Sequence, residues 1–522
     1  LVTEVDSLRM LQDEIMKFTP AEIVCNDAFY MSGLDFEDLK ARIHTVISTL
    51  EARYFQDDRC FQCLREHFHV QNVEGLGLAD FEVGAIAAGA LMQYLTETQK
   101  TSLAHLSHIQ TYRTGGFMIL DTSTRHNLEL TETLREKNKR GSLLWVLDKT
   151  CTAMGARLLR TFIEQPLLDR DEILARHDAI EALNQSYITR EELREYLNPI
   201  YDLERLISRI TYQSANPRDL LAFGRSIEML PPIKQQLREF ASGILKQIHD
   251  DLDCLEDLAG LLSSALVDEP PVAVREGGII RDGYHEEVDR LRHAKTDGKT
   301  WLAQLEEKER EATGIKNLRI KFNKVFGYYF EVTNSFKALV PDRYIRKQTL
   351  TNAERFTTPE LKELEEVILG AEDKLFILEY NLFCGLRDQL ASQVVRIQKS
   401  ASAVAGLDVL VSLALVAEQN RYVRPSINEK GIIDIKGGRH PVVEKMMRDE
   451  LFISNDTYLD NGRNRVSVIT GPNMAGKSTY MRQTALIALM AQIGSFVPAD
   501  SADIGICDRI FTRVGASDDL AS

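Results

Sequence analysis

Residues 471–479 read Gly-Pro-Asn-Met-Ala-Gly-Lys-Ser-Thr and match the phosphate-loop pattern G-x-x-x-x-G-K-[ST]. In this pattern the glycines let backbone N–H groups curl around phosphate oxygens, the lysine places a positive charge on the terminal phosphates, and the next hydroxyl serves Mg²⁺. Lys477 and Ser478 are therefore the candidate catalytic groups, and Ser478 is the candidate Mg²⁺ ligand. The expected nucleotide contacts in this loop are Gly471, Pro472, Asn473, Met474, Ala475, Gly476, Lys477, Ser478 and Thr479.

The residues around this loop favour an α/β nucleotide-binding fold over a chance match. A β-branched run at 465–470 predicts a strand that leads into the loop, and 431–435 predicts another. Residues 478–493 have helical spacing, which would aim a helix N-terminus at the phosphates. No carboxylate strand and no group to orient water follow Ser478, so we expect this chain alone to bind nucleotide weakly and hydrolyse it poorly.

Most of the chain before the loop has the apolar periodicity of helices. The pattern runs from about residue 80 to residue 266, and prolines and glycines interrupt it at 268–284. A charged helix is expected at 286–312, followed by a short β segment. From Pro359 to Pro425 the pattern is again helical, and it would span on the order of 95 Å if it did not break near Gly406.

The start of the chain differs from this helical body. Residues 1–78 predict a mixed α/β segment with a strand at 22–25 and a helix at 36–53. The predicted fold class is therefore multidomain α+β: mostly helical, with long helical arms, a small β-containing module at their tip, and a partial P-loop α/β domain. An ordinary helical domain with a charged hairpin is the alternative at this point.

Composition restricts the possible partners. The formal net charge of −15 opposes general affinity for nucleic acid, so any such surface must be local. Seven cysteines are too few for a disulfide framework in 522 residues, which suits a reducing compartment. No run approaches the roughly 20 uninterrupted apolar residues of a membrane span, so no membrane partner is expected.

Residues 313–348 supply such a local surface, because they hold eight lysines and arginines but only two acids. Strand alternation over 318–322 puts Arg319 and Lys321 on one face and apolar residues on the other. Contacts of this kind neutralise phosphates without reading bases, so binding would be sequence-independent and salt-sensitive. A solvated basic surface is the alternative. The candidate DNA contacts are Arg319, Lys321, Asn323, Lys324, Lys347, Asn352 and Arg355.

Three segments resemble the MutS family of DNA mismatch repair ATPases. They are residues 471–499, residues 511–519 (Phe-Thr-Arg-Val-Gly-Ala-Ser-Asp-Asp) and residues 438–444 (Gly-Arg-His-Pro-Val-Val-Glu). Residues 120–130 and 314–332 look like the family's lever and clamp regions. The resemblance implies an ABC-type ATPase whose two subunits close levers and clamps around duplex DNA.

The same resemblance implies a division of the chain and a set of partners. It implies ATP or ADP with Mg²⁺ as cofactors, mismatched double-stranded DNA as ligand, a homodimer, a MutL-type repair partner, and a cytoplasmic, nucleoid-associated location. The implied domains are a partial connector at 1–78, a helical core and lever at 79–285, a clamp at 286–371, returning lever helices at 372–425, and the first half of the ATPase domain at 426–522.

Residues 452–456 are similar to the family's adenine-contacting loop. The resemblance implies that Phe452 stacks on the base while neighbouring backbone groups read the base edge, and Asn455 is a further candidate nucleotide contact. Ile453 and Ser454 replace the commoner valine and proline, which makes the loop less rigid but leaves stacking possible. A core phenylalanine is the alternative for Phe452.

Two parts of the family pattern are missing from the sequence. There is no mismatch-reading segment with a Phe-x-Glu wedge, and no second ATPase half with the Walker B strand, signature loop and switch histidine. We therefore expect a piece of a longer protein. The alternatives are a relative that controls recombination without sensing mismatches, an ABC-type ATPase that tethers DNA, and a P-loop kinase, which fits poorly because most of the chain precedes the loop.

Overall fold

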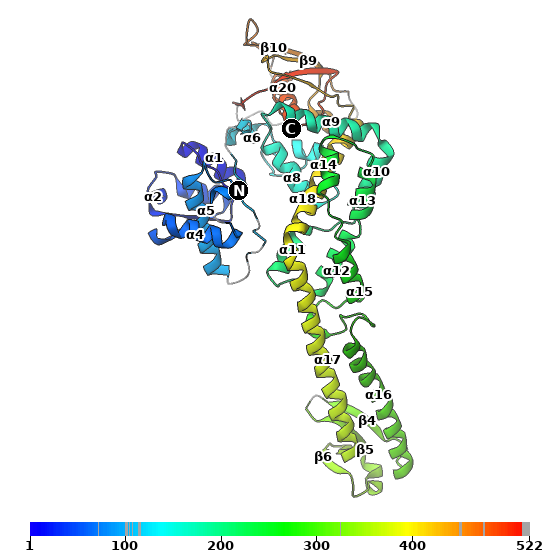
Figure 1. The fold of residues 1–522 in the computed structure, drawn as a ribbon. Helices are drawn as coiled ribbons and strands as arrows, with labels where there is room; N and C mark the ends of the chain where they lie inside the picture. The colour runs from blue at the N-terminus through cyan, green and yellow to red at the C-terminus, as the bar shows by residue number, and fades with distance from the viewer. Residues whose placement is uncertain are drawn as a thin grey trace. The chain divides into compact units, whose positions relative to one another are not determined.

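The computed structural model describes residues 1–70, 72–99, 103, 105–106, 108–112, 116–323, 325–447, 451–472 and 475–513. The chain divides into two compact units (Figure 1). The first unit comprises Leu1–Tyr212, Arg225–Leu255 and Gln393–Ser522, and the second comprises Gln213–Gly224 and Glu256–Ser392. Helices predominate and the sheets are small, so the α+β class is confirmed.

The N-terminal part of the first unit combines two short strands with helices. Its elements are α1 (Leu8–Phe18), β1 (Glu22–Cys25), α2 (Asp27–Tyr30), α3 (Phe36–Ile43), β2 (Val46–Thr49), η1 (Ala52–Phe55), α4 (Asp57–Phe68), η2 (Glu74–Leu76) and α5 (Glu82–Gln99). β1 and β2 pair in parallel, which confirms the predicted strand at 22–25. The predicted helix at 36–53 is wrong beyond Ile43. His44 takes a left-handed φ of 53°, and the β-branched residues of β2 bond to β1 instead.

A bundle of helices makes up the middle of the first unit. Its elements are β3 (Ile119–Leu120), α6 (Thr122–Asn127), α7 (Leu143–Leu147), α8 (Ala153–Glu164), α9 (Arg170–Gln185), α10 (Tyr187–Leu197), α11 (Leu203–Thr211), α13 (Leu230–Leu237), α14 (Gly243–Asp251) and α18 (Val394–Gln419), while α12 (Pro217–Ile227) crosses the division at Gly224. The helical character predicted from residue 80 onward is confirmed. Apolar residues at 190–210 are buried in α10 and α11, and the chain breaks between these helices at Asn198-Pro199.

Helix α18 is the core of this bundle, because it contacts α7, α8, α9, α10, α11 and α14. It is the one helix among the described residues long and apolar enough to cross a membrane, but 89% of its most apolar window is buried inside the protein. The break in this helical stretch falls at Gln393 rather than near Gly406, because α17 ends at Ser392 and α18 begins at Val394. Burial on nearly all sides outweighs the roughly 1 kcal/mol that one glycine costs a helix.

The C-terminal part of the first unit contains a four-stranded sheet in the order β10-β9-β11-β8. Its elements are β8 (Ser426–Asn428), β9 (Ile433–Gly438), α19 (Pro441–Met446), β10 (Asn455–Leu459), α20 (Lys477–Gln492), β11 (Ser501–Gly505) and β12 (Arg509–Ile510). β9 runs antiparallel to β10 and β11, β11 runs parallel to β8, and β12 pairs with β3. The strand predicted at 431–435 is present two residues later, as β9.

The strand predicted at 465–470 is wrong for this structure. These residues form no strand, and Val466 and Val468 are 81% and 86% exposed. A β-branched run becomes a strand only when a neighbouring strand satisfies its backbone N–H and C=O groups. Within the part of the chain that the structure describes, no strand pairs with this run.

The second unit is built from two long helices and an antiparallel sheet. Its elements are α15 (Glu256–Ala265), η4 (Val274–Glu276), α16 (Glu286–Thr313), β4 (Arg319–Asn323), β5 (Gly327–Thr333), η5 (Asn334–Leu339), β6 (Ile345–Thr349), β7 (Ala353–Thr357) and α17 (Pro359–Ser392). The strand order is β4-β5-β7-β6. One core joins α16 and α17 to the sheet, through Leu305, Phe330, Phe356 and Leu361. The predicted charged helix, β segment and long helix are confirmed.

Candidate functional site

The phosphate-loop motif lies at the N-terminal end of α20. Gly476 takes a φ of 81°, a left-handed conformation that glycine adopts readily, and the helix begins at the next residue, Lys477. The Lys477 ammonium donates a hydrogen bond of 2.5 Å to the carbonyl oxygen of Gly471, so the side chain bridges the two ends of the loop. Asn473 and Met474, two of the predicted contacts, lie outside the described residues.

Burial changes along α20 from its first turn to its last. Met481 is 51% exposed, whereas Leu486, Leu489 and Met490 are fully buried. The helix ends at Gln492, two residues before Gly494, which has a φ of 86°. The first turn, residues 477–480, is only partly buried, and the positive end of the helix dipole favours an anion there.

The C-terminal end of α20 is fixed to the helical bundle. Gln492 is fully buried, and its side-chain amide donates to the carbonyl oxygens of Leu167 and Cys507 and accepts from the Cys507 N–H. The guanidinium of Arg176, in α9, donates a 2.8 Å hydrogen bond to the Ile493 carbonyl. The last turn of the phosphate-loop helix is therefore fixed to the helical bundle.

The predicted base-contacting residues come just before β10. Phe452 is partly exposed rather than part of the core, and Ile453 beside it is 83% exposed. Asn455, the first residue of β10, donates from its side chain to the Ile453 carbonyl. Phe452 is thus partly exposed at the surface, although no contact among the described residues joins it to the phosphate loop.

Tyr480 connects these two parts of the candidate nucleotide site, and the motif did not reveal it. Tyr480 lies in the first turn of α20. Its hydroxyl donates a 3.1 Å hydrogen bond to the Asp456 carbonyl and accepts a 2.9 Å hydrogen bond from the Thr457 hydroxyl, both in β10. The phosphate loop and the segment 452–456 are therefore held to each other by one phenol group. An aromatic residue with a polar tip directly after the loop was the only sequence signal for this role.

The segment 438–444 has a structural part beside the sheet. His440 caps α19, where its Nδ1 accepts from the Val443 N–H, and burial followed by the charge of Arg482 lowers its pKa to about 3. Arg439 pairs with Glu444 at 2.8 Å and donates to the Arg421 carbonyl. These residues join the end of β9 to the end of α18 and do not line the phosphate loop.

The chemistry of the loop suits Mg²⁺ bound together with phosphate. The one predicted protein ligand is the Ser478 hydroxyl, and no cluster of three or more His, Cys, Asp or Glu side chains able to hold a metal occurs among the described residues. Mg²⁺ commonly keeps several waters and binds through few protein groups plus phosphate oxygens. A single hydroxyl in the first turn of α20 fits that mode.

The basic residues predicted to contact DNA lie in the second unit, and three of them share one face of its sheet. Arg319 in β4 is opposite Glu331 in β5, which is opposite Arg355 in β7. Lys321 lies two residues along β4 from Arg319 and therefore points to the same side. The other side carries Ile320, Phe330 and Phe356, which pack into the core of this unit.

The remaining candidates lie at the ends of the strands. Asn323 is the last residue of β4 and pairs with Gly327 at the β4–β5 hairpin. Lys347 donates a 2.8 Å hydrogen bond to the Phe326 carbonyl in the same hairpin. Asn352 lies in the β6–β7 turn, where its carbonyl accepts from the Asn334 N–H at the other end of β5. Lys324 lies outside the described residues. The structure thus distributes the predicted contacts over one face and both ends of the sheet.

Acids from neighbouring segments neutralise part of the local positive charge. Lys337 pairs with Glu354 at 2.6 Å, and Lys321 pairs with Glu331 at 2.8 Å. Glu309, buried in α16, pairs with Arg343 at 2.8 Å and accepts a hydrogen bond from the Tyr344 hydroxyl. Burial raises the pKa of Tyr344, and the hydrogen bond to Glu309 raises it further. Glu309 and Glu354 lie outside residues 313–348. Their ion pairs with Arg343 and Lys337 therefore neutralise part of the net positive charge that those residues carry in the sequence.

Comparison with protein families matches most of this chain to one family. The family profile described as MutS domain III matches residues 123–414, that of MutS domain II matches residues 1–110, and that of MutS domain V matches residues 467–522. Domain III alone spans more than half of the chain. The match of domain V includes the phosphate loop and α20.

Curated relatives agree with these profiles. The chain is 63% identical over 521 residues to the DNA mismatch repair protein MutS of Lachnoclostridium phytofermentans, covering 100% of this chain and 56% of the relative. It is 52% identical to that of Acetivibrio thermocellus, covering 100% and 60%, and 52% identical to that of Ruminiclostridium cellulolyticum, covering 98% and 58%. The chain spans somewhat more than half the length of these relatives, and by the extent of these matches it belongs to the MutS family.

Proposed function

We propose that this chain is the DNA-embracing and phosphate-binding portion of a DNA mismatch repair protein, an ATP-regulated clamp on mismatched duplex DNA. The observation that carries the proposal is the phosphate loop at the exposed start of α20, tied through Tyr480 to the segment 452–456. The names of the curated relatives support the same function.

In this proposal the first unit binds ATP or ADP through residues 471–479. Backbone N–H groups of the loop and the first turn of α20 hold the phosphates, and Lys477 exchanges its bond to the Gly471 carbonyl for a phosphate oxygen. The Ser478 hydroxyl would hold Mg²⁺, which supplies charge neutralisation at the phosphates when bound. Phe452 stacks on the base and Asn455 lies beside it.

The second unit supplies the contact to duplex DNA. Arg319, Lys321 and Arg355 offer one row of positive charge, and Asn323, Lys324, Lys347 and Asn352 extend it at the strand ends. These groups would bind phosphates without reading bases, so mismatch preference would come from elsewhere in the protein. The affinity of this surface should fall steeply as salt rises.

The rest of the proposal concerns the assembly. We place the connector at 1–78, the core and lever at 79–285, the clamp at 286–371, the returning lever at 372–425 and the first ATPase half, of ABC type, at 426–522. The working protein is a cytoplasmic, nucleoid-associated homodimer that hydrolyses ATP and signals to a MutL-type partner. Hydrolysis also requires a carboxylate that helps to hold Mg²⁺ and a group that orients the attacking water.

The test uses a protein of the relatives' full length that contains this chain, bound to mismatched duplex with blocked ends. ATP should accelerate release when one end is opened, and Lys477→Ala should abolish that acceleration while nucleotide-free affinity for DNA changes by less than about twofold. Lys430→Ala, an exposed lysine in the turn between β8 and β9, is the matched control and should behave as the parent protein. ATP-driven release that persists in Lys477→Ala would refute the proposal.

A further inference from the structure

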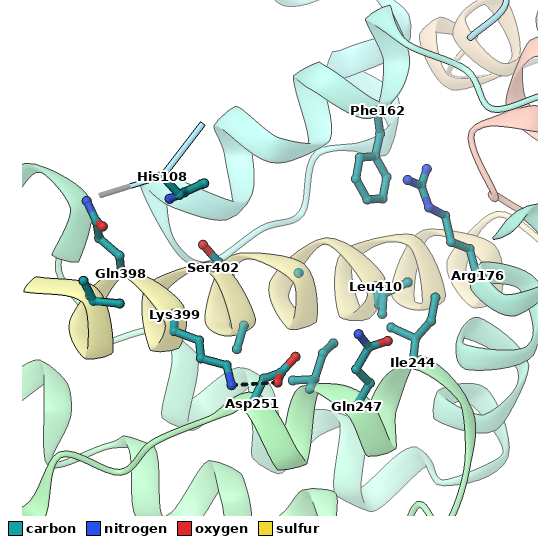
Figure 2. A pocket seen from close by; sticks show the side chains of 14 residues that line it. His108, Phe162, Arg176, Ile244, Gln247, Asp251, Gln398, Lys399, Ser402 and Leu410 are labelled. Atoms are coloured by element: carbon teal, nitrogen blue, oxygen red, sulfur yellow. Dashed lines mark ion pairs between the residues drawn. The ribbon is translucent and has the colours of Figure 1, made fainter. Parts of the chain in front are cut away.

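A cavity of about 570 Å³ lies in the helical bundle of the first unit, away from the phosphate loop (Figure 2). Helices α14 and α18 form its long walls, and α8 and α9 close one end through Phe162 and Arg176. Its apolar lining includes Ile244, Ile248 and Leu410. A volume in this range suits a small organic molecule.

Arg176 is the exceptional residue in this lining. Its guanidinium stacks over the ring of Phe162 at 3.5 Å and donates to the Ile493 carbonyl, and burial lowers its pKa to about 10. Glu172, one turn earlier on α9, is exposed and forms no ion pair with it. Among the described residues, no carboxylate lies within ion-pair distance of this guanidinium. The Arg176 charge is mostly buried and has a carbonyl and an aromatic ring as partners but no counter-ion, which is unfavourable in free energy. An anion beside it would offset that unfavourable free energy.

The other polar groups around the cavity do not supply that anion. Asp251, the one acid in the lining, pairs with Lys399 at 3.0 Å. Figure 2 shows this pair along α18, removed from the end where Phe162 and Arg176 lie. The lining therefore carries one positive charge in excess, located at the Arg176 end, with amide and hydroxyl groups of Gln247 and Ser402 elsewhere.

We propose that this cavity is a binding site for a small amphipathic anion, an organic carboxylate or sulfonate with an apolar body. The acidic group would bind the free N–H groups of Arg176, and the apolar body would lie between α14 and α18. The site is separate from those proposed for nucleotide and DNA, and its lining residues belong to neither.

The experiment uses two fluorescent probes of matched apolar size, 8-anilinonaphthalene-1-sulfonate, which is an anion, and N-phenyl-1-naphthylamine, which is neutral. Arg176→Met, which keeps the length of the side chain, should weaken sulfonate binding at least tenfold and change binding of the neutral probe by less than threefold. Arg176→Lys should retain most of the sulfonate affinity. Arg160→Met, at an exposed arginine of α8 paired with Glu164, is the control and should change neither affinity.

A second variant keeps the proposal testable if Arg176→Met fails to fold. Gly406→Leu places a side chain into the cavity, where a Cβ on Gly406 would meet only the Ile248 side chain, at 3.8 Å. This variant should weaken the binding of both probes at least tenfold. Sulfonate binding that survives in Gly406→Leu, or that is equal in Arg176→Met and the parent chain, overturns the proposal. Displacement of the sulfonate by Mg²⁺-ATP would place it at the phosphate loop and would equally overturn it.

Discussion

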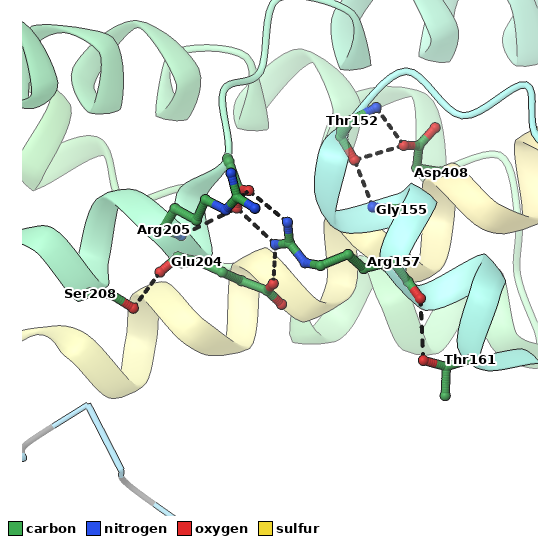
Figure 3. Close-up of polar contacts among 9 residues, drawn as sticks. Thr152, Gly155, Arg157, Thr161, Glu204, Arg205, Ser208 and Asp408 are labelled. Atoms are coloured by element: carbon green, nitrogen blue, oxygen red, sulfur yellow. Dashed lines mark hydrogen bonds and ion pairs between the residues drawn. The ribbon is translucent and has the colours of Figure 1, made fainter. Parts of the chain in front are cut away.

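The Asp408 carboxylate in α18 accepts hydrogen bonds from both the backbone N–H and the hydroxyl of Thr152, each at 2.7 Å, at the N-terminus of α8 (Figure 3). The Cys151 N–H adds a third bond at 2.8 Å. A buried acid of the core helix thereby holds the capping residue of a neighbouring helix, while the Thr152 hydroxyl accepts from the Gly155 N–H. The contact requires glycine at residue 155, because a Cβ there would lie 2.2 Å from the Asp408 Oδ2.

Gly155→Ala should destabilise the first unit by roughly 1–3 kcal/mol, because the new methyl group must displace a fully bonded carboxylate. Urea unfolding followed by Trp145 fluorescence measures this in a Trp301→Phe background, since these are the only two tryptophans and Trp145 lies in the first unit. Gly406→Ala is the control in α18, where the Cβ has room, and should be neutral or stabilising by up to about 1 kcal/mol. Equal losses in the two variants would contradict the interpretation.

Glu379→Ala should destabilise the second unit by about 1–3 kcal/mol. The Glu379 carboxylate is 1% exposed, accepts a 2.6 Å hydrogen bond from the Gly278 N–H and pairs with Arg292, so its removal leaves that N–H without its acceptor and leaves Arg292 with Asp282 as its remaining carboxylate partner. Trp301 fluorescence in a Trp145→Phe background should report the loss, while Trp145 in the converse background should not. Lys308→Ala, in an exposed pair with Glu360, should cost less than about 1 kcal/mol.

Tyr480→Phe should weaken binding of Mg²⁺-ATP about fivefold, because the lost hydroxyl no longer holds the first turn of α20 to Asp456 and Thr457. Calorimetric titration of the full-length protein measures the change. Tyr458→Phe alters a 44% exposed tyrosine of β10 and should have little effect. If both variants bind nucleotide as the parent does, the hydroxyl has no role in positioning the site.

Arg319→Ala should weaken DNA binding by the full-length protein more than Lys321→Ala does. Both residues share one face of β4, but Lys321 is already paired with Glu331, while Arg319 forms no ion pair within the described part of the chain. Loss of one phosphate contact should reduce the slope of log affinity against log salt by about 1. Fluorescence anisotropy across a salt series gives both quantities, and a larger effect of Lys321→Ala would contradict this reading of the surface.

Stability of the first unit should fall as pH drops from about 6.5 to 4. His177 is fully buried against Phe496, and burial, followed by the charge of Arg424, lowers its pKa to about 4. The unfolded chain binds this proton near pH 6.5, so between these values the unfolded state holds more protons and gains stability, by up to about 3 kcal/mol. His177→Leu should remove that part of the pH dependence of urea unfolding, although His440 leaves a residual slope of the same sign.

Local pattern was sufficient for most of the helices and for the phosphate loop. The spacing of apolar residues in α10, α16 and α20 and the glycines at 476 and 494 act within a few residues, so they are readable from sequence. The pattern did not locate the break between α17 and α18, because burial of α18 on nearly all sides stabilises Gly406 in a helix, and burial is a property of the fold.

The candidate sites show the same limit. Tyr480 contacts β10 through a tertiary pairing that no spacing encodes, and Glu309 and Glu354 reach the basic face from outside the segment in which charge was counted. Val466 and Val468 have strand-forming side chains but need a neighbouring strand. Their conformation depends on what lies beside them rather than on their own preference.

The attachment of α20 by Gln492 and Arg176 makes the last turn of that helix a fixed pivot. The first turn is tied to β10 by Tyr480, so a displacement of the phosphate loop must either bend that turn or tilt the whole helix and press on α9 through the Ile493 carbonyl. The first response stays local. Tilting of the whole helix moves the bundle. The stiffness of the sixteen residues of α20 therefore determines whether a change at the phosphate loop reaches α9.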